Sequence, residues 1–188
     1  MATISNKAQA MPASAIRKLV PLADAAKKQG VKVYHLNLGQ PDIKSPKCAL
    51  DAVKNFNQEN VSYSHSAGLM DLRKGLVEKY YKKIGIDITV DELIVTVAGS
   101  ESVNLALEIT CNPGDEVIVL EPFYTNYNTF AFMNGLTLKA IQTDIRNGFQ
   151  IPPIEEFEKA ITDKTKAILV CNPGNPTGTQ YSKESMLA

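Results

Sequence analysis

Residues 167 to 178, AILVCNPGNPTG, join an apolar run to a loop with two prolines, two glycines and two asparagines. The run from Ala167 to Val170 predicts a buried strand, because no polar residue interrupts it and turn formers follow it. Pro173 and Pro176 fix their own φ and keep the residue before them out of the helical region. The two asparagines therefore sit in a backbone with little freedom. Such a loop is typical of a ligand site at a strand end, and an ordinary strand-to-helix turn uses the same residues.

The composition is that of a soluble globular domain. The chain has 188 residues, of which 44% are hydrophobic and 21% charged, so it is long enough to bury a sizeable core. Twenty basic and twenty acidic side chains leave no net charge, and no basic stripe is interleaved with aromatic residues, so no nucleic-acid partner is expected. The longest apolar runs are far shorter than the ~20 residues of a membrane-spanning helix, so no membrane partner is expected either.

The cysteines give no sign of a disulfide framework or a metal site. Cys48, Cys111 and Cys171 are odd in number and widely spaced, and neither His35 nor His65 pairs with them at a metal-ligand spacing. We therefore expect no metal, free thiols and a cytoplasmic location.

Strands and helices alternate from residue 91 onward, which predicts a largely parallel sheet with helices on both faces. Upstream, helices are expected over residues 14–29, 45–56 and 69–81, and a strand over 31–38. Downstream, strands are expected at 93–97, 116–120, 136–141 and 167–170, helices at 100–110, 124–133 and 154–161, and a surface turn at 148–153.

Three loops are expected to meet at one edge of this sheet. If the strands at 93–97, 116–120 and 167–170 are parallel neighbours, the loops that follow them lie at the carboxyl edge, where open α/β sheets bind ligands. The sequence therefore predicts a small-molecule site built from these loops.

The first loop has the features of an anion site. Gly99 allows a ligand to approach the backbone closely, and Ser100 with Glu101 begins a helix whose unpaired N–H groups and dipole attract phosphate. A serine at this position is also an ordinary helix cap, so both interpretations stay open.

The other two loops offer aromatic rings and an amide. Tyr124 and Tyr127 follow a proline, where an aromatic face could cover a flat ring, although core packing uses the same residues. The amide of Asn175 could donate to a phenolic oxygen and favour its ionised form. Together the three loops indicate a phosphorylated aromatic cofactor.

At this point the chain resembles the class I aminotransferases, the aspartate aminotransferase-like branch of the fold-type I pyridoxal phosphate enzymes. The resemblance extends over essentially the whole chain and rests on five motifs in family order. These motifs are NLGQPD at 37–42, YSHSAGLMDLR at 63–73, TVAGSES at 96–102, PGDEVIVLEPFYTNY at 113–127 and NPGNPTG at 172–178.

The resemblance implies a three-layer α/β fold with a mostly parallel central sheet. Residues 1–45 would form an N-terminal arm and small-domain segment, and residues 46–188 the N-terminal portion of the large domain that binds pyridoxal 5'-phosphate. It also implies cis peptide bonds at Glu121-Pro122 and Asn175-Pro176.

The resemblance also assigns roles to individual residues. Gly99, Ser100 and Glu101 would hold the cofactor phosphate, chiefly through N–H groups, and Tyr124 would stack on the pyridine ring. Asn175 would donate to the phenolic oxygen. Gly39 would meet the substrate carboxylate through its backbone, and Tyr63 would reach the cofactor phosphate of the partner subunit in a homodimer.

The chain departs from the family in length. It stops before the region in which the family keeps its Schiff-base lysine, so no catalytic residue is expected within it. We expect the N-terminal part of an aminotransferase that moves an amino group between an amino acid and a 2-oxo acid, inactive on its own. The alternatives are another fold-type I enzyme, such as a β-eliminating lyase, and a non-catalytic fragment that binds the cofactor or a subunit.

Overall fold

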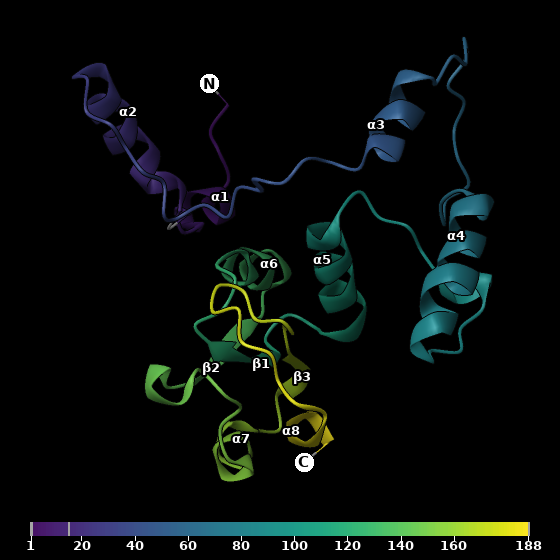
Figure 1. Ribbon diagram of the computed structural model, residues 1–188. Coiled ribbons are helices and arrows are strands. Elements are labelled where there is room, and N and C mark those ends of the chain that lie inside the picture. Colours follow the sequence, from purple (N-terminus) through teal and green to yellow (C-terminus); the bar gives the residue numbers. More distant parts are fainter. Residues whose placement is uncertain (1, 15, 188) are drawn as a thin grey trace. The chain divides into compact units, whose positions relative to one another are not determined.

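Three parallel strands form the sheet of the computed structural model, which describes residues 2–14 and 16–187. The strands are β1 (Glu116–Glu121), β2 (Thr137–Gln142) and β3 (Thr165–Leu169), in the order β2-β1-β3 (Figure 1). The central strand β1 is apolar on both faces, and its residues Val117, Ile118 and Val119 are fully buried. A continuous apolar strand of this kind is typical of a parallel sheet with covered faces.

Helices pack on both faces of this sheet. On one face, α5 (Gly99–Thr110) and α6 (Asn126–Asn134) contribute buried side chains, among them Leu107 and Phe130, to a core with Val117 and Val119. On the other face, Ile118 packs in a second cluster with residues of α7 (Ile154–Ala160). Figure 1 shows α6 and α7 on opposite sides of the strands. The predicted three-layer α/β architecture with a parallel sheet is therefore confirmed.

The chain divides into two compact units. The first comprises Met1–Leu38 and Val103–Ala188, and the second Gly39–Ser102, so the first four residues of α5 belong to the second unit. The remaining helices of the first unit are α1 (Asn6–Ala10), α2 (Val20–Lys28) and α8 (Lys183–Leu187), with 3₁₀ turns at Arg17–Leu19 and Ile145–Asn147. The proposed domain boundary after residue 45 stays a prediction.

The second unit is helical. It contains α3 (Lys47–Lys54) and α4 (Met70–Leu76), and α4 continues as a π-helical turn at Val77–Tyr81 and a 3₁₀ turn at Lys82–Ile84. A further 3₁₀ turn, Val90–Glu92, begins with a capping box between Thr89 and Glu92. The Arg73 side chain of α4 is 3% exposed, and its Nη1 donates to the carbonyl of Val90 at 2.7 Å. This bond ties the helix to the turn that precedes residues 93–97.

Two predicted strands do not form. Residues 31–38 and 93–97 have no strand neighbour in the described part of the chain, and they leave apolar side chains exposed, such as Leu36 and Val97. A strand needs a neighbour to pair its backbone groups, and an apolar alternation alone does not supply one. The expectation that 93–97 neighbours the strand at 116–120 is therefore wrong, because β1 lies between β2 and β3.

The predicted helices form with small shifts of their ends. In the segment 14–29, the α-helix begins only at Val20, and Pro21 occupies its first turn, where proline is tolerated. Both cis peptide bonds expected, Glu121-Pro122 and Asn175-Pro176, are present, and Asn172-Pro173 is cis as well.

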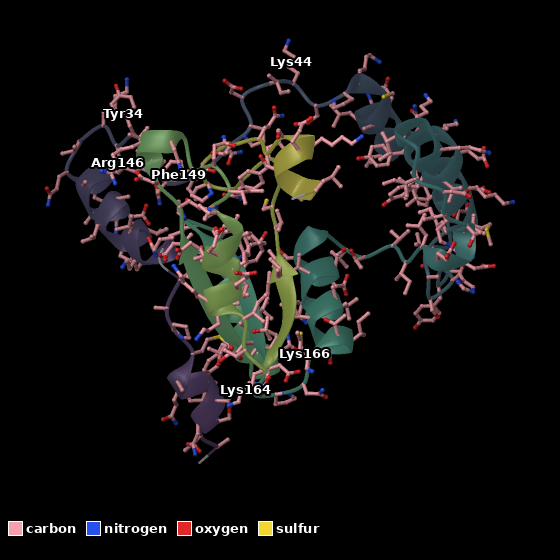
Figure 2. The ribbon with its side chains drawn as sticks, turned by 90° about the horizontal axis from the view of Figure 1, so that it is seen from below. Tyr34, Lys44, Arg146, Phe149, Lys164 and Lys166 are labelled. Carbon is pink, nitrogen blue, oxygen red and sulfur yellow. The ribbon has the colours of Figure 1, made fainter. Side chains whose placement is uncertain are left out.

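The strands all run in one direction, so their carboxyl ends share one edge of the sheet. Figure 2 marks this edge by Arg146 and Phe149, on the segment that follows β2, and the opposite edge by Lys164 and Lys166, where β3 begins. Two of the three predicted loops, those after β1 and β3, therefore lie at the same edge.

Candidate functional site

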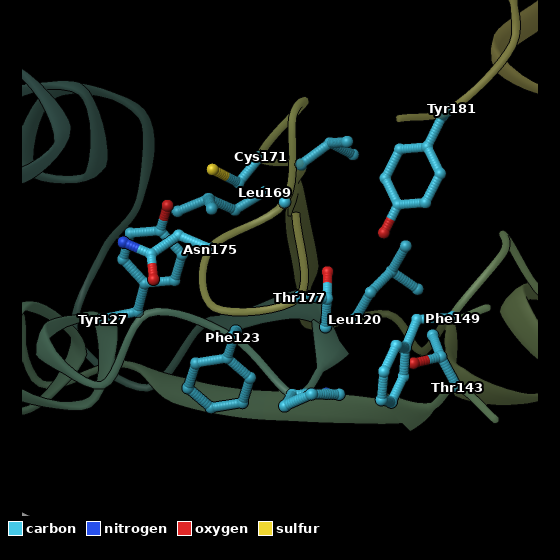
Figure 3. Close-up of a pocket in the computed structure, with 13 residues that line it drawn as sticks. Leu120, Phe123, Tyr127, Thr143, Phe149, Leu169, Cys171, Asn175, Thr177 and Tyr181 are labelled. Atoms are coloured by element: carbon cyan, nitrogen blue, oxygen red, sulfur yellow. The ribbon is translucent and has the colours of Figure 1, made fainter. Parts of the chain in front are cut away.

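A small pocket opens at the carboxyl edge of β1 and β3. Its walls come from the ends of these strands, the loops after them, α6 and the turn that contains Phe149 (Figure 3). At one end of the pocket, Figure 3 shows Phe123, Tyr127 and Asn175 together; Phe149 and Tyr181 lie at the other end. The loop of the sequence motif NPGNPTG thus forms a wall of a pocket.

The two asparagines of this loop have different surroundings. The Asn172 side chain accepts a hydrogen bond from the Tyr181 N–H at 3.0 Å and donates to the Tyr181 carbonyl at 3.5 Å. The Asn175 amide is exposed and has no hydrogen-bond partner among the described residues. Asn172 therefore closes the loop, and Asn175 keeps its donors available at the pocket.

Backbone hydrogen bonds fix the shape of the loop. The Gly174 N–H donates to the Thr179 carbonyl at 2.8 Å, and the Gly178 N–H donates to the Gly174 carbonyl at 2.7 Å. A Cβ at Gly174 would lie 2.6 Å from Oγ1 of Thr177, so only glycine fits without a shift. The Cys171 thiol donates to the Pro173 carbonyl at 3.3 Å. The position of Asn175 is thus set by the closed loop around it.

Aromatic side chains build the inner wall of the pocket. Tyr127 is 7% exposed, and its ring stacks on Phe123 with centroids 6.2 Å apart and packs edge-on against Tyr124 at 5.5 Å. Tyr127 and Phe123 line the pocket, whereas Tyr124 packs against the core and accepts a hydrogen bond from Asn126 at 2.7 Å. The sequence offered both tyrosines as rings that could cover a flat ligand, and the family resemblance implied ring stacking for Tyr124 alone. Tyr127 lies three residues further along, within α6, whereas Tyr124 precedes this helix.

The phenols at the pocket remain protonated at neutral pH. Burial is the main cause that raises the pKa of Tyr127 to about 12, and the neighbouring Cys171 and Tyr124 raise it further. Burial and the same cysteine also raise the pKa of Tyr181. Both hydroxyl groups are therefore neutral hydrogen-bond donors rather than general bases.

The start of α5, in the second unit, offers free backbone donors. The N–H groups of Gly99 and Ser100 have no acceptor among the described residues, whereas the Glu101 N–H donates to the Ala98 carbonyl at 3.0 Å. A Cβ at Gly99 would meet nothing within 4 Å, so the space in front of this turn is open. With the dipole of a 12-residue helix behind them, these N–H groups suit an anion.

The other predicted site residues also belong to the second unit. The side chain of Tyr63 is fully exposed, and Gly39 lies in an exposed segment with open space around its Cα. The structure brings Asn175 together with Tyr127 and Phe123. That Gly39, Tyr63 and the start of α5 join them in one site stays a prediction.

The far end of the pocket gave no signal in the sequence. Phe149, with φ of 60°, and Tyr181 both line it, although residues 148–153 were expected to be only a surface turn. The Thr179 hydroxyl donates to the Gly148 carbonyl at 2.8 Å and so holds this turn to the loop after β3. Such a contact between distant segments leaves no local pattern that sequence reasoning could use.

Among residues 2–14 and 16–187, no three histidine, cysteine or acidic side chains are grouped as a metal site would require. No helix in that same part of the chain has the length and apolar character needed to cross a membrane.

Comparison with known proteins gives consistent results over nearly the whole chain. The model of the family "Aminotransferase class I and II" matches residues 31–188. The aspartate/prephenate aminotransferase of Thermus thermophilus is 35% identical over 100% of this chain and 49% of its own length. The chain therefore spans about half the length of the curated relatives it matches.

Solved structures agree with this assignment. An alanine aminotransferase from Pyrococcus furiosus superposes with a TM-score of 0.90 and 36% identity, over 98% of this chain and 48% of that chain. An aspartate aminotransferase from Thermotoga maritima gives a TM-score of 0.88 and 32% identity, over 97% and 49%. The sequence motifs, the parallel sheet and the pocket at its carboxyl edge have the same explanation: the chain belongs to the class I and II aminotransferase family.

Proposed function

We propose that this chain is the N-terminal part of a pyridoxal phosphate-dependent aminotransferase that moves an amino group between an amino acid and a 2-oxo acid. The observation that carries the proposal is one end of the pocket, where the Asn175 amide, which has no hydrogen-bond partner among residues 2–14 and 16–187, lies beside the buried ring of Tyr127. A flat ligand with an ionised oxygen would fit here, because its ring could lie against the aromatic side chains and its oxygen could accept a hydrogen bond from the Asn175 amide. The family assignment supports the same chemistry.

The residues present fit this cofactor. Its phosphate needs several N–H donors, and Gly99 and Ser100 offer two without a partner among the described residues, with open space in front of Gly99. Its phenolic oxygen needs a donor, and the Asn175 amide is unpaired within the same part of the chain. When bound, pyridoxal phosphate supplies an electron sink for the bonds at the substrate Cα.

The chain's own residues would bind and orient the reactants. The Asn175 amide would donate to the phenolic oxygen and stabilise its ionised form. The N–H groups of Gly99 and Ser100 would anchor the phosphate at the turn that Glu101 completes, and Tyr124 would stack on the pyridine ring. The Gly39 backbone would meet the substrate carboxylate.

We further propose a homodimer, in which Tyr63 reaches the partner's cofactor phosphate. Its fully exposed side chain is available for such a contact. A cytoplasmic location is proposed because Cys48, Cys111 and Cys171 are all free thiols.

The test compares the product of the complete reading frame with residues 1–188 alone. Each is mixed with pyridoxal phosphate, one amino acid from a panel and an acceptor 2-oxo acid, and the 2-oxo acid formed from that amino acid and the ammonia released are measured. The proposal expects 2-oxo acid without ammonia from the complete protein, and none from residues 1–188, because no lysine here stands in a matching motif. Ammonia release would instead indicate a β-eliminating lyase, and turnover by residues 1–188 would show that the chain is catalytically complete.

A further inference from the structure

A ring of hydrogen bonds surrounds the turn that begins α5. The Glu101 carboxylate oxygen Oε2 accepts the Val97 N–H at 2.6 Å. The Thr96 hydroxyl donates to the Ala98 carbonyl at 3.1 Å and lies 2.7 Å from the Ser102 hydroxyl. Because the Thr96 hydrogen is used for Ala98, Ser102 must donate to Thr96. The side chains of Glu101 and Ser102 thus both turn back onto the segment that enters the helix.

Some hydrogen-bonding groups of this turn have a partner within the described chain, and others have none. The Glu101 N–H donates to Ala98, and its carboxylate accepts from Val97. Within the described chain, the N–H groups of Gly99 and Ser100 and the Ser100 hydroxyl have no partner. The donors available to an anion are therefore those just before Glu101, and Glu101 itself acts on the backbone.

The segment before the helix needs this support. Residues 93–97 pair with no strand in the described chain, and Val97 is 94% exposed. Upstream, the Val95 N–H donates to the Ala67 carbonyl at 3.0 Å. At Val97 the carboxylate of Glu101 supplies the acceptor that a neighbouring strand would otherwise provide.

We propose that Glu101 is a positioning residue for the phosphate-binding turn, and this inference rests on the proposed function. By holding the Val97 N–H, its carboxylate sets the direction in which the Gly99 and Ser100 N–H groups point. Its negative charge at the same place opposes an incoming phosphate. The side chain therefore favours binding through its geometry and disfavours it through its charge, and substitutions can separate the two effects.

The experiment uses the complete protein and titrates pyridoxal phosphate and pyridoxal, which lacks the phosphate, by absorbance. Glu101→Ala removes the acceptor and the charge, and Glu101→Gln keeps an acceptor oxygen and removes only the charge. We expect Glu101→Ala to raise the Kd for pyridoxal phosphate about tenfold, the size of one charged hydrogen bond, with the Kd for pyridoxal unchanged. Glu101→Gln should bind pyridoxal phosphate as tightly as wild type or more tightly.

Glu108→Ala is the matched control, because Glu108 is exposed on the same helix and its side chain has no hydrogen bond within the described chain. It should leave both constants unchanged. The inference is overturned if Glu101→Ala and Glu101→Gln both tighten pyridoxal phosphate binding, which indicates a charge effect alone, or if neither changes the ratio of the two constants. A wild-type protein that does not prefer the phosphorylated compound overturns the proposed function itself. Loss of the preference in Glu101→Ala with its retention in Glu101→Gln supports positioning even if the alanine variant melts at a lower temperature.

Discussion

Two isoleucines that are register partners in the sheet provide a matched test of the core. Ile118 of β1 pairs with Ile168 of β3, so both side chains lie on the same face. Ile118 is fully buried, whereas Ile168, on the edge strand, is 47% exposed. Replacement of either isoleucine by alanine removes the same atoms and lowers the β-strand propensity by a similar amount. The difference in unfolding free energy between the two variants therefore measures the effect of burial.

The expected costs follow from this difference. Ile118→Ala removes three buried carbon groups at about 0.8 kcal/mol each, and the cavity left behind brings the loss of unfolding free energy to about 3–4 kcal/mol. Ile168→Ala removes about half as much buried surface and leaves no closed cavity, so we expect about 1 kcal/mol. The cluster around Ile118 includes Leu120 of the same strand and Ile141 of β2, which cannot fill the space without moving the sheet.

Urea unfolding of the 188-residue chain, followed by far-ultraviolet circular dichroism, measures both costs. With a slope of about 2 kcal/mol per molar urea, the two midpoints should differ by about 1 M, with that of Ile118→Ala the lower. Protein concentrations are chosen at which the midpoint no longer depends on concentration. Equal midpoints for the two variants would refute the reasoning, because Ile168 would then be as well covered as Ile118.

Three further predictions concern the candidate site. Because the pKa of Tyr127 is raised to about 12, absorbance at 295 nm should show one phenol that titrates later than the exposed ones and that is absent in Tyr127→Phe. The stability that this phenol contributes should be complete below pH 10 and lost between pH 10 and 12. Titration of Tyr127 near pH 10, with the exposed phenols, would contradict this. Gly99→Ala should keep the free energy of unfolding unchanged or raise it by up to about 1 kcal/mol, while a Cβ at the open face of the turn weakens pyridoxal phosphate binding. Unchanged binding in the complete protein would remove the phosphate role of this turn. Asn172→Ala should lower the free energy of unfolding by about 1–2 kcal/mol, because it removes two hydrogen bonds to Tyr181. Asn175→Ala should leave the free energy of unfolding unchanged and shift the absorbance of the bound cofactor. A loss of stability in Asn175→Ala and an absorbance shift in Asn172→Ala would show that these roles are assigned to the wrong amides.

Local patterns were sufficient to predict the three strands that pair with one another and the helices between residues 14 and 161, but not the short helices α1 and α8. The run at 116–120 predicts a buried strand because it has apolar side chains on both faces. In the structure it forms β1, the buried central strand of the sheet. The same reasoning is wrong for 31–38 and 93–97, because a strand also needs a partner, and the pattern of one segment does not report whether another segment lies beside it. The pairing expected between 93–97 and the strand at 116–120 fails for the same reason, whereas the parallel pairing of 116–120 with the strand at 167–170 is confirmed.

The candidate site divides in a similar way. Asn175 could be singled out from the sequence, because the prolines around it restrict its backbone. The structure then separates the two asparagines of the loop, because only Asn172 uses its side chain for hydrogen bonds, to Tyr181, within the described chain. Tyr127 could also be singled out, as a ring that could cover a flat ligand. Phe149 and Tyr181 depend on contacts between segments that are distant in the chain, such as the Thr179 hydroxyl on the Gly148 carbonyl. Their place in the pocket is a property of the packed unit and not of any short motif.

Glu101 shows how a side chain in a recognisable motif can act differently from what its position suggests. The motif TVAGSES places it among the phosphate-binding residues, and its carboxylate would be the wrong charge for a direct contact. In the structure that carboxylate is bonded to the Val97 N–H, in a segment whose backbone has no strand partner within the described chain. The absence of a strand at 93–97 and the acidic residue in an anion-binding turn thus have one physical explanation: the carboxylate occupies the place of a missing backbone acceptor, and the donors before it stay free for the ligand.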